Sequence, residues 1–268
     1  MTNSYTIRGG RLGRERLRVL SNVLQTGTNT FLDRLGIRPG MVCLDVGCGG
    51  GDVTRELARR VGSAGRAVGI DMDADQLKIV RAEAEAHNIG NITLIAADAT
   101  TPPKDIDKFD VVYSRFLLCH LPTRTQVFEW MKSRLKDGGI LALEDCDFTG
   151  HFCYPPSAAF NRYVTLAGDV MRQRGGDPHF GLKLPELFMQ NGLRIGGIEI
   201  AHPADIDGDP KLLNALSMEL FAEAIVSEGL AEQAEVRELT DNLRAAVGDR
   251  HVYASVTRRI QVWGQKLA

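Results

Sequence analysis

The chain has 268 residues, of which 44% are hydrophobic and 25% are charged, so it is a globular chain rather than a disordered one. The formal net charge is −2 and the isoelectric point is about 6.3. These values argue against a nucleic-acid-binding domain, which usually has a clustered basic surface. The length suits one α/β domain with additions.

Five cysteines are present, an odd number without any Cys-x-x-Cys pair. We therefore predict neither a disulfide framework nor a metal site, and we expect a reducing cytoplasm as the location. No apolar run in the sequence is long enough to cross a membrane. We accordingly expect a small-molecule substrate, with no nucleic acid and no membrane as partners, and we leave a homodimer open.

Residues 1–40 are predicted to form an N-terminal helical lid, because Leu17, Leu20 and Leu24 fall on one face of a helix. Residues 42–54 are predicted to run as strand, glycine turn and helix. The glycines of the turn permit positive φ and let a ligand approach the bare backbone. Such a turn at a helix N-terminus indicates a binding loop for a nucleotide-like ligand.

An alternation of strands and helices continues from this loop. Helices are predicted at 53–61, at 74–87 and in a run that carries Val127, Met131 and Leu135, and strands at 67–70, 92–96, 109–113 and 140–144. Thr123 and Gln126 are predicted to form a capping box for the third of these helices. The pair Gly138-Gly139 is predicted to end that helix before the next strand begins.

The alternation breaks at residues 149–192, where aromatic and polar residues gather and predict an inserted substrate cap. The rest of the chain is predicted to form strands at 193–200 and 252–263, with helices at 211–226 and 232–247 in a helical insertion at about 210–248. Together the elements predict an α/β fold. It is a doubly wound, Rossmann-like sheet of seven strands over residues 41–268, with helices on both faces, the N-terminal lid and the inserted cap.

Three acidic residues follow successive strands of this predicted sheet. Asp45, Asp71 and Asp98 each fall at or just beyond the end of a strand. Ligands of such folds bind at the carboxyl ends of the strands, so the three carboxylates are expected in one crevice.

The glycine spacing distinguishes between two classes of ligand. In the dinucleotide fingerprint the third glycine comes three residues after the second, and Asp52 occupies that place here. Asp45 would oppose a pyrophosphate but would suit the positive charges of S-adenosylmethionine. On these residues the chain resembles the class I S-adenosylmethionine-dependent methyltransferases, of the small-molecule type that includes the quinone-biosynthesis enzymes.

The resemblance covers residues 40–147 well and implies S-adenosyl-L-methionine as the cofactor. It implies that the loop at Gly47 and Gly49 holds the methionine part of the cofactor and that Asp45 favours the ammonium. It further implies that Asp71 accepts hydrogen bonds from both ribose hydroxyls, which requires an acceptor with two oxygens.

The same resemblance assigns the adenine and the methyl group to residues farther along the chain. Met72 would pack on the adenine, and Asp98 with the backbone amide of Ala99 would bind its polar edge. Ser114 and Arg115 would lie near the transferring methyl group and the methionine carboxylate. The cap matches no family pattern in detail, so the acceptor stays open.

His120 is the candidate catalytic base, since histidine titrates near neutral pH and the residue follows the fourth strand. The alternative is that it orders its loop. We expect methyl transfer to an oxygen, nitrogen or carbon atom of a small molecule, such as an aromatic compound, a quinone or another product of secondary metabolism. An NAD-dependent oxidoreductase and a non-catalytic cofactor-binding subunit are the alternatives, although the first normally has a Tyr-x-x-x-Lys motif that this sequence lacks.

Overall fold

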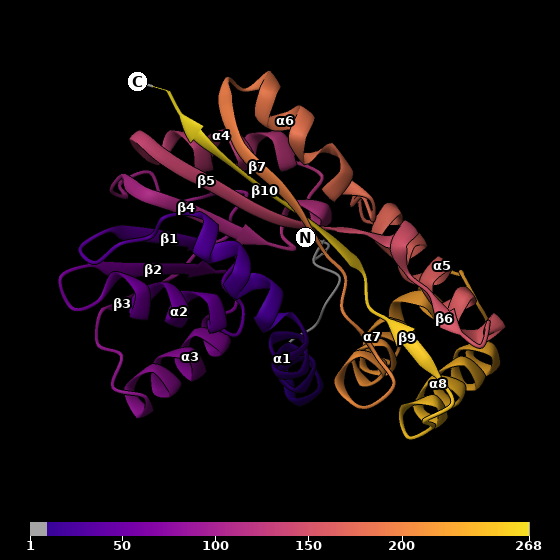
Figure 1. Cartoon of the computed structure of the whole chain (residues 1–268). Helices are drawn as coiled ribbons and strands as arrows, with labels where there is room; N and C mark the ends of the chain where they lie inside the picture. The colour runs from indigo at the N-terminus through magenta and orange to yellow at the C-terminus, as the bar shows by residue number, and fades with distance from the viewer. Residues whose placement is uncertain (1–9, 268) are drawn as a thin grey trace.

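The structure, a computed structural model, describes residues 10–267. Its main body is a seven-stranded sheet (Figure 1). In spatial order the strands are β3 (Ile92–Ala96), β2 (Arg66–Asp71), β1 (Val42–Val46), β4 (Phe109–Arg115), β5 (Leu135–Asp147), β10 (Arg258–Lys266) and β7 (Leu193–Ala201). The first five run parallel, and β10 is antiparallel to both of its neighbours. The predicted doubly wound sheet is confirmed.

Helices cover both faces of the sheet. Successive side chains of a strand point to opposite faces, so each face has its own hydrophobic core under the helices. The covering helices are α1 (Gly10–Arg34), α2 (Asp52–Val61), α3 (Ala74–Ala86), α4 (Arg124–Ser133) and α6 (Leu184–Gln190). Cys43 packs with α1 and α2, whereas the next residue of β1, Leu44, packs with α4 and α6. On that second face Phe128 and Phe188 meet edge to face, with ring centroids 5.5 Å apart.

The predicted N-terminal lid is a helix over residues 10–34, and the part of that prediction on residues 1–9 lies outside the described residues. Its C-terminal half is anchored on the sheet, where Phe31 contacts Trp263 at 5.8 Å between ring centroids. Its N-terminal half extends beyond the sheet toward α7 (Asp209–Ser227) (Figure 1). None of the helices within residues 10–267 is long and apolar enough to span a bilayer.

The junction between α4 and β5 differs from the prediction. Thr123 precedes α4 without a side-chain capping bond, and Leu135 opens β5 instead of closing the helix. The glycine pair lies inside the strand, next to an irregularity in the pairing with β4. A Cβ on Gly139 would come within 3.0–3.2 Å of three backbone oxygens, so glycine is needed there for a close approach of chains and not for a helix end.

The predicted cap and helical insertion pack as one unit beside the sheet (Figure 1). Its elements are α5 (Ala158–Gln173), α7, α8 (Gln233–Val247) and a small sheet of β6 (Cys153–Tyr154), β9 (Tyr253–Ser255) and β8 (Ala204–Asp205). The strand expected at 252–263 is in fact two strands, since β9 joins the small sheet and β10 the main one. Likewise α6, which falls within the range predicted for the cap, packs on the main sheet.

A buried polar cluster attaches α1 to the sheet. Thr28 of α1 accepts a hydrogen bond from Nη1 of Arg259 at 2.8 Å, and the same nitrogen contacts Glu144 at 2.6 Å. Both charged side chains are fully buried. Tyr113 and Gln261 also donate to the Glu144 carboxylate, so its charge is fully compensated.

We expect Arg259→Met to lower the free energy of unfolding by about 3–5 kcal/mol, because it leaves the Glu144 carboxylate buried without its cation. Urea denaturation measures the change. The matched control is Arg34→Met, which removes an ion pair between α1 and Glu199 in which Arg34 is 59% exposed. That pair should contribute about 1 kcal/mol or less. Equal losses in the two variants would contradict the assignment.

Candidate cofactor and substrate site

The loop between β1 and α2 is built for close approach to its backbone. Gly47, Gly49 and Gly51 have φ values of 73°, 48° and 67°, which glycine adopts without strain. At Gly51 a Cβ would also lie 2.3 Å from a methyl of Val80. The loop is pinned to β2, because the amides of residues 47 and 48 both donate to the carbonyl of Ile70.

Asp71, at the end of β2, orders the same loop. Its Oδ2 accepts the amide of Gly49 at 2.8 Å, and its Oδ1 accepts the amide of Asp73 at 2.9 Å. A carboxylate has about four lone-pair positions, so both oxygens can accept a further hydrogen bond from a ligand. Burial raises the pKa of Asp71, although the backbone amides that it accepts work in the opposite direction.

Asp45 is the most deeply buried of the three strand-end acids, at 2% exposure. Its Oδ2 accepts the hydroxyl of Thr54 at 2.6 Å. Burial raises the pKa of Asp45 to about 7, the nearby carboxylates of Asp52 and Asp71 add to the shift, and Arg115 opposes it. A cation placed beside this carboxyl would favour its ionised form.

Asp98 and Met72 complete the rim of the crevice. Oδ1 of Asp98 accepts both the amide and the hydroxyl of Thr100 at 2.8 Å, which leaves Oδ2 for other partners. Met72 is 49% exposed, and Ala99 is almost buried.

These residues surround a cavity of about 500 Å³, which is within the usual range for a ligand site. Of the residues predicted from sequence, the cavity is lined by Asp45, Gly47, Gly49, Asp71, Met72, Asp98, Ala99, Arg115 and His120. Ser114 is not among the lining residues, because its hydroxyl donates to the carbonyl of Val46 at 2.7 Å and is buried between β4 and β1. Its proposed contact with the cofactor has no support in this geometry.

The α1 helix supplies one wall of the cavity through Arg16, Leu17 and Leu20. These residues were not predicted to contact a ligand. Leu17 and Leu20 were expected to pack as part of an apolar face, and that periodicity is the signal that could have placed them here. Leu17 is the side chain nearest to Gly49 and Gly50, so α1 directly covers the glycine loop.

Arg115 lies at the base of the cavity with its charge already compensated. Nη2 contacts both oxygens of Asp52, at 2.8 and 3.0 Å, and Nη1 donates to Thr28 at 3.2 Å. Burial opposes ionisation of Asp52, but the adjacent guanidinium outweighs it and lowers the Asp52 pKa. The pair joins α1, β4 and the N-terminus of α2 at the glycine loop.

A second cavity of about 70 Å³ adjoins the first, between the sheet and the helices α5 and α7. Four residues line both cavities: Arg16, Leu20, Phe116 and His120. Most of the remaining wall is apolar, and its aromatic rings belong to Phe148, His151, Tyr163 and Phe221. We call this space the inner cavity.

Two residues at the boundary between the cavities have unusual environments. Phe116 has a φ of 53°, a conformation rare for a side chain of its size and typical of functional sites. His120 belongs to the short helix η1 (Leu118–His120) and is buried. Burial lowers the pKa of His120 to about 4, and Arg16 adds to the effect, so the imidazole is neutral at neutral pH and does not titrate there as the sequence led us to expect.

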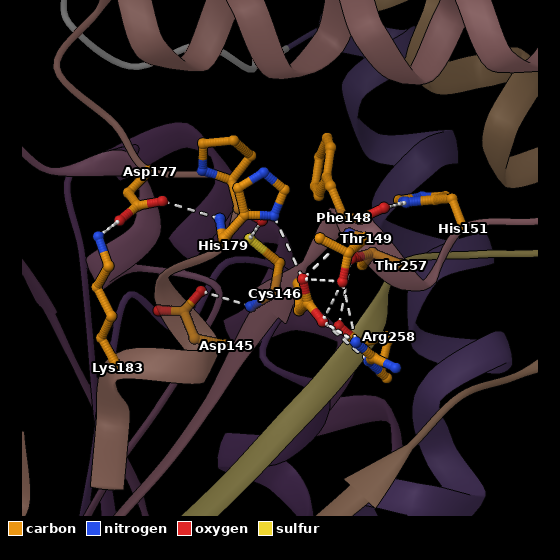
Figure 2. A network of polar contacts seen from close by, with 12 residues as sticks. Asp145, Cys146, Phe148, Thr149, His151, Asp177, His179, Lys183, Thr257 and Arg258 are labelled. Atoms are coloured by element: carbon orange, nitrogen blue, oxygen red, sulfur yellow. Dashed lines mark hydrogen bonds and ion pairs between the residues drawn. The ribbon is translucent and has the colours of Figure 1, made fainter. Parts of the chain in front are cut away.

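A polar network fixes the cap beside the inner cavity (Figure 2). Asp147, at the end of β5, accepts hydrogen bonds from Arg258 of β10 and from Thr149. It also contacts the ring of His179 at 3.3 Å. His179 is held in turn by Asp177, which forms an ion pair with Lys183 at 2.6 Å. These acids therefore have structural partners.

Residues 37–169 match the model of a methyltransferase domain family. Among curated proteins, the chain is 35% identical over 133 residues to the ubiquinone/menaquinone biosynthesis C-methyltransferase of Idiomarina loihiensis. The match covers 49% of this chain and 50% of that protein, so the chain spans half of the length of this relative. The matched family residues include the glycine loop and all three strand-end acids.

Solved structures show the same fold across most of the chain. A proposed methyltransferase from Bacillus halodurans C-125 has a TM-score of 0.64 at 18% identity, covering 91% of this chain and all of that one. The phosphoethanolamine N-methyltransferase 2 of Haemonchus contortus, solved with phosphomonomethylethanolamine and S-adenosylhomocysteine, has a TM-score of 0.58 at 16% identity. That match covers 93% of this chain and 56% of the other.

Protonation of Asp45 should be coupled to the binding of a cationic ligand. Because the pKa of Asp45 is about 7, this carboxyl group is mostly protonated in the free protein below neutral pH. A bound ammonium favours the carboxylate, so binding releases a proton. We expect the affinity for S-adenosylmethionine, measured by calorimetry, to rise roughly tenfold between about pH 5.5 and pH 7.

The control for this prediction is Asp45→Asn, which should weaken binding and make it nearly independent of pH. Asp75→Asn changes an exposed acid of α3 and should preserve both the affinity and its pH dependence. If the rise in affinity with pH persisted in the Asp45→Asn protein, another group would be responsible.

Proposed function

We propose that this protein, whose chain carries a class I S-adenosylmethionine-dependent methyltransferase domain, transfers a methyl group from S-adenosylmethionine to a small-molecule acceptor held in the inner cavity. The observation that carries the proposal is the junction of two cavities. One is of mixed polarity and is lined by the glycine loop and the strand-end acids, and the other is more apolar.

The larger cavity fits the cofactor in size and in chemistry. Bound S-adenosylmethionine would supply a methyl carbon activated by a sulfonium. Asp45 would attract the ammonium, and the spare lone pairs of Asp71 would accept from the ribose hydroxyls. Oδ2 of Asp98 and the exposed Met72 side chain are free to contact the adenine.

The inner cavity would bind the reacting end of the acceptor. Its apolar wall favours an aromatic or other hydrophobic molecule and excludes water from the transfer. The protein's main task is then to align the acceptor with the methyl carbon for an in-line displacement. Quinones are one candidate class, since the Idiomarina relative is named for ubiquinone and menaquinone biosynthesis.

His120 is the residue that we propose to receive the acceptor's proton. It lines both cavities, so its imidazole faces the space where acceptor and methyl group would meet. An oxygen or nitrogen nucleophile must lose a proton during transfer, and the buried site offers water little access.

We expect Asp71→Ala to weaken S-adenosylmethionine binding at least tenfold, because about two charge-assisted hydrogen bonds to the ribose are lost. Calorimetry on folded protein measures the affinity, with a thermal melt as the check of folding. Asp75→Ala is the matched control, since its carboxylate is exposed and pairs only locally with Lys78. Unchanged affinity in the Asp71→Ala protein would refute the cofactor assignment.

We expect His120→Ala to lower kcat at least about 100-fold while the S-adenosylmethionine affinity stays within a factor of about two. The assay follows labelled methyl transfer to an acceptor found by screening phenols, quinols and amines. His179→Ala, which removes a ring that lines neither cavity, should retain most of the activity. A loss of both turnover and cofactor binding in the His120→Ala protein would indicate that the residue orders its loop.

A further inference from the structure

Two thiols and a carboxylate from two segments of the chain, one at residue 119 and one at residues 145–146, converge beside the inner cavity. Cys119 comes from η1, and Asp145 and Cys146 come from the end of β5. One ligand atom of each residue, a sulfur or a carboxylate oxygen, lies within 4.8 Å of the other two, and all three residues are buried. We call this group the thiol–carboxylate cluster.

The carboxylate of the cluster is already held in place. Oδ2 of Asp145 accepts the amide of Cys119 at 3.0 Å, and Oδ1 accepts the amide of Cys146 at 2.9 Å, the second of which is drawn in Figure 2. The side chains of Cys119 and Cys146 also hydrogen-bond to this carboxylate, so a cation bound here would take the place of thiol protons. Backbone contacts of this kind orient metal-binding carboxylates and fix their geometry.

The charge of Asp145 distinguishes it from its neighbours on β5. Glu144 is paired with Arg259, and Asp147 is paired with Arg258. Asp145 is 2% exposed, and within residues 10–267 no Lys or Arg forms an ion pair with it. Buried carboxylates are normally compensated by a cationic side chain or by a metal ion.

We propose that the thiol–carboxylate cluster binds a thiophilic divalent cation, of which Zn²⁺ is the type, through Cys119 Sγ, Cys146 Sγ and one oxygen of Asp145. Two sulfur ligands select such cations over Mg²⁺ and Ca²⁺, which prefer oxygen. Zinc–sulfur bonds of about 2.3 Å in a tetrahedron place two sulfurs roughly 3.8 Å apart, so the cluster needs at most a small contraction.

Both sulfur-bearing residues line the inner cavity, which provides a path of entry for the cation. Three protein ligands leave the fourth tetrahedral position to a water or a ligand atom, as in catalytic rather than structural zinc sites. Because both thiols line the inner cavity, a cation bound to them would be next to the space that we assign to the acceptor. Cation binding does not depend on that assignment and can be tested without any acceptor.

The test is a titration of reduced, chelator-treated protein with Co²⁺ and with Cd²⁺, followed by the charge-transfer absorption of metal–thiolate bonds. We expect one cation per chain and displacement of Co²⁺ by Zn²⁺. Cys119→Ser and Cys146→Ser should each reduce the absorption and weaken binding at least tenfold, and Mg²⁺ should not compete. Cys153→Ser, which alters a partly exposed thiol outside the cluster, should bind as the unmodified protein does.

A second measurement needs no variant and so is independent of folding defects. Alkylation of the unmodified protein with and without Zn²⁺, followed by peptide mapping, should show slower reaction at Cys119 and Cys146 only, with Cys153 unaffected. The proposal would be overturned if the reduced protein showed no thiolate absorption with either cation. It would also be overturned if binding survived both serine substitutions, or if a protein with a Cys119–Cys146 disulfide bound no cation after that disulfide had been reduced.

Discussion

The carboxylate of Glu144 is the point at which the sheet, α1 and the glycine loop are joined. It is fully buried and contacts Arg259 of β10, and both of them contact Thr28 of α1. Thr28 also accepts from Arg115, whose guanidinium holds Asp52 at the start of α2. Because Thr28 contacts both ion pairs, Arg259 with Glu144 and Arg115 with Asp52, the position of α1 over the cavity and the position of the glycine loop are coupled.

This coupling places two different environments next to each other. The strand ends and the glycine loop bring three carboxylates to the larger cavity, while α1, α5 and α7 enclose the more apolar inner cavity. A methyl group carried on a cation in the first space would meet a nucleophile in the second, away from bulk water. His120 and the strained Phe116 lie at the boundary, where geometry matters most for the transfer.

Local patterns in the sequence predicted the first half of the fold closely, since β1, the glycine loop and α2 are specified by adjacent residues. The predicted start of β5 was wrong, because Gly139 serves a close approach to the backbone of β4 that only the tertiary structure reveals. The side chain of Ser114 could not be oriented from sequence, and α1 was predicted as a lid without its contacts to the loop. The thiol–carboxylate cluster follows no spacing rule, because η1 and β5 meet only in the folded chain.

The most direct test of the account is a calorimetric titration of the purified protein with S-adenosylmethionine, S-adenosylhomocysteine and NAD in parallel. We predict that the two adenosyl ligands bind with one site per chain and compete with each other, and that NAD does not bind. Binding of NAD alone, or of none of the three, would contradict the assignment of the cavity formed by Gly47, Asp71 and Asp98.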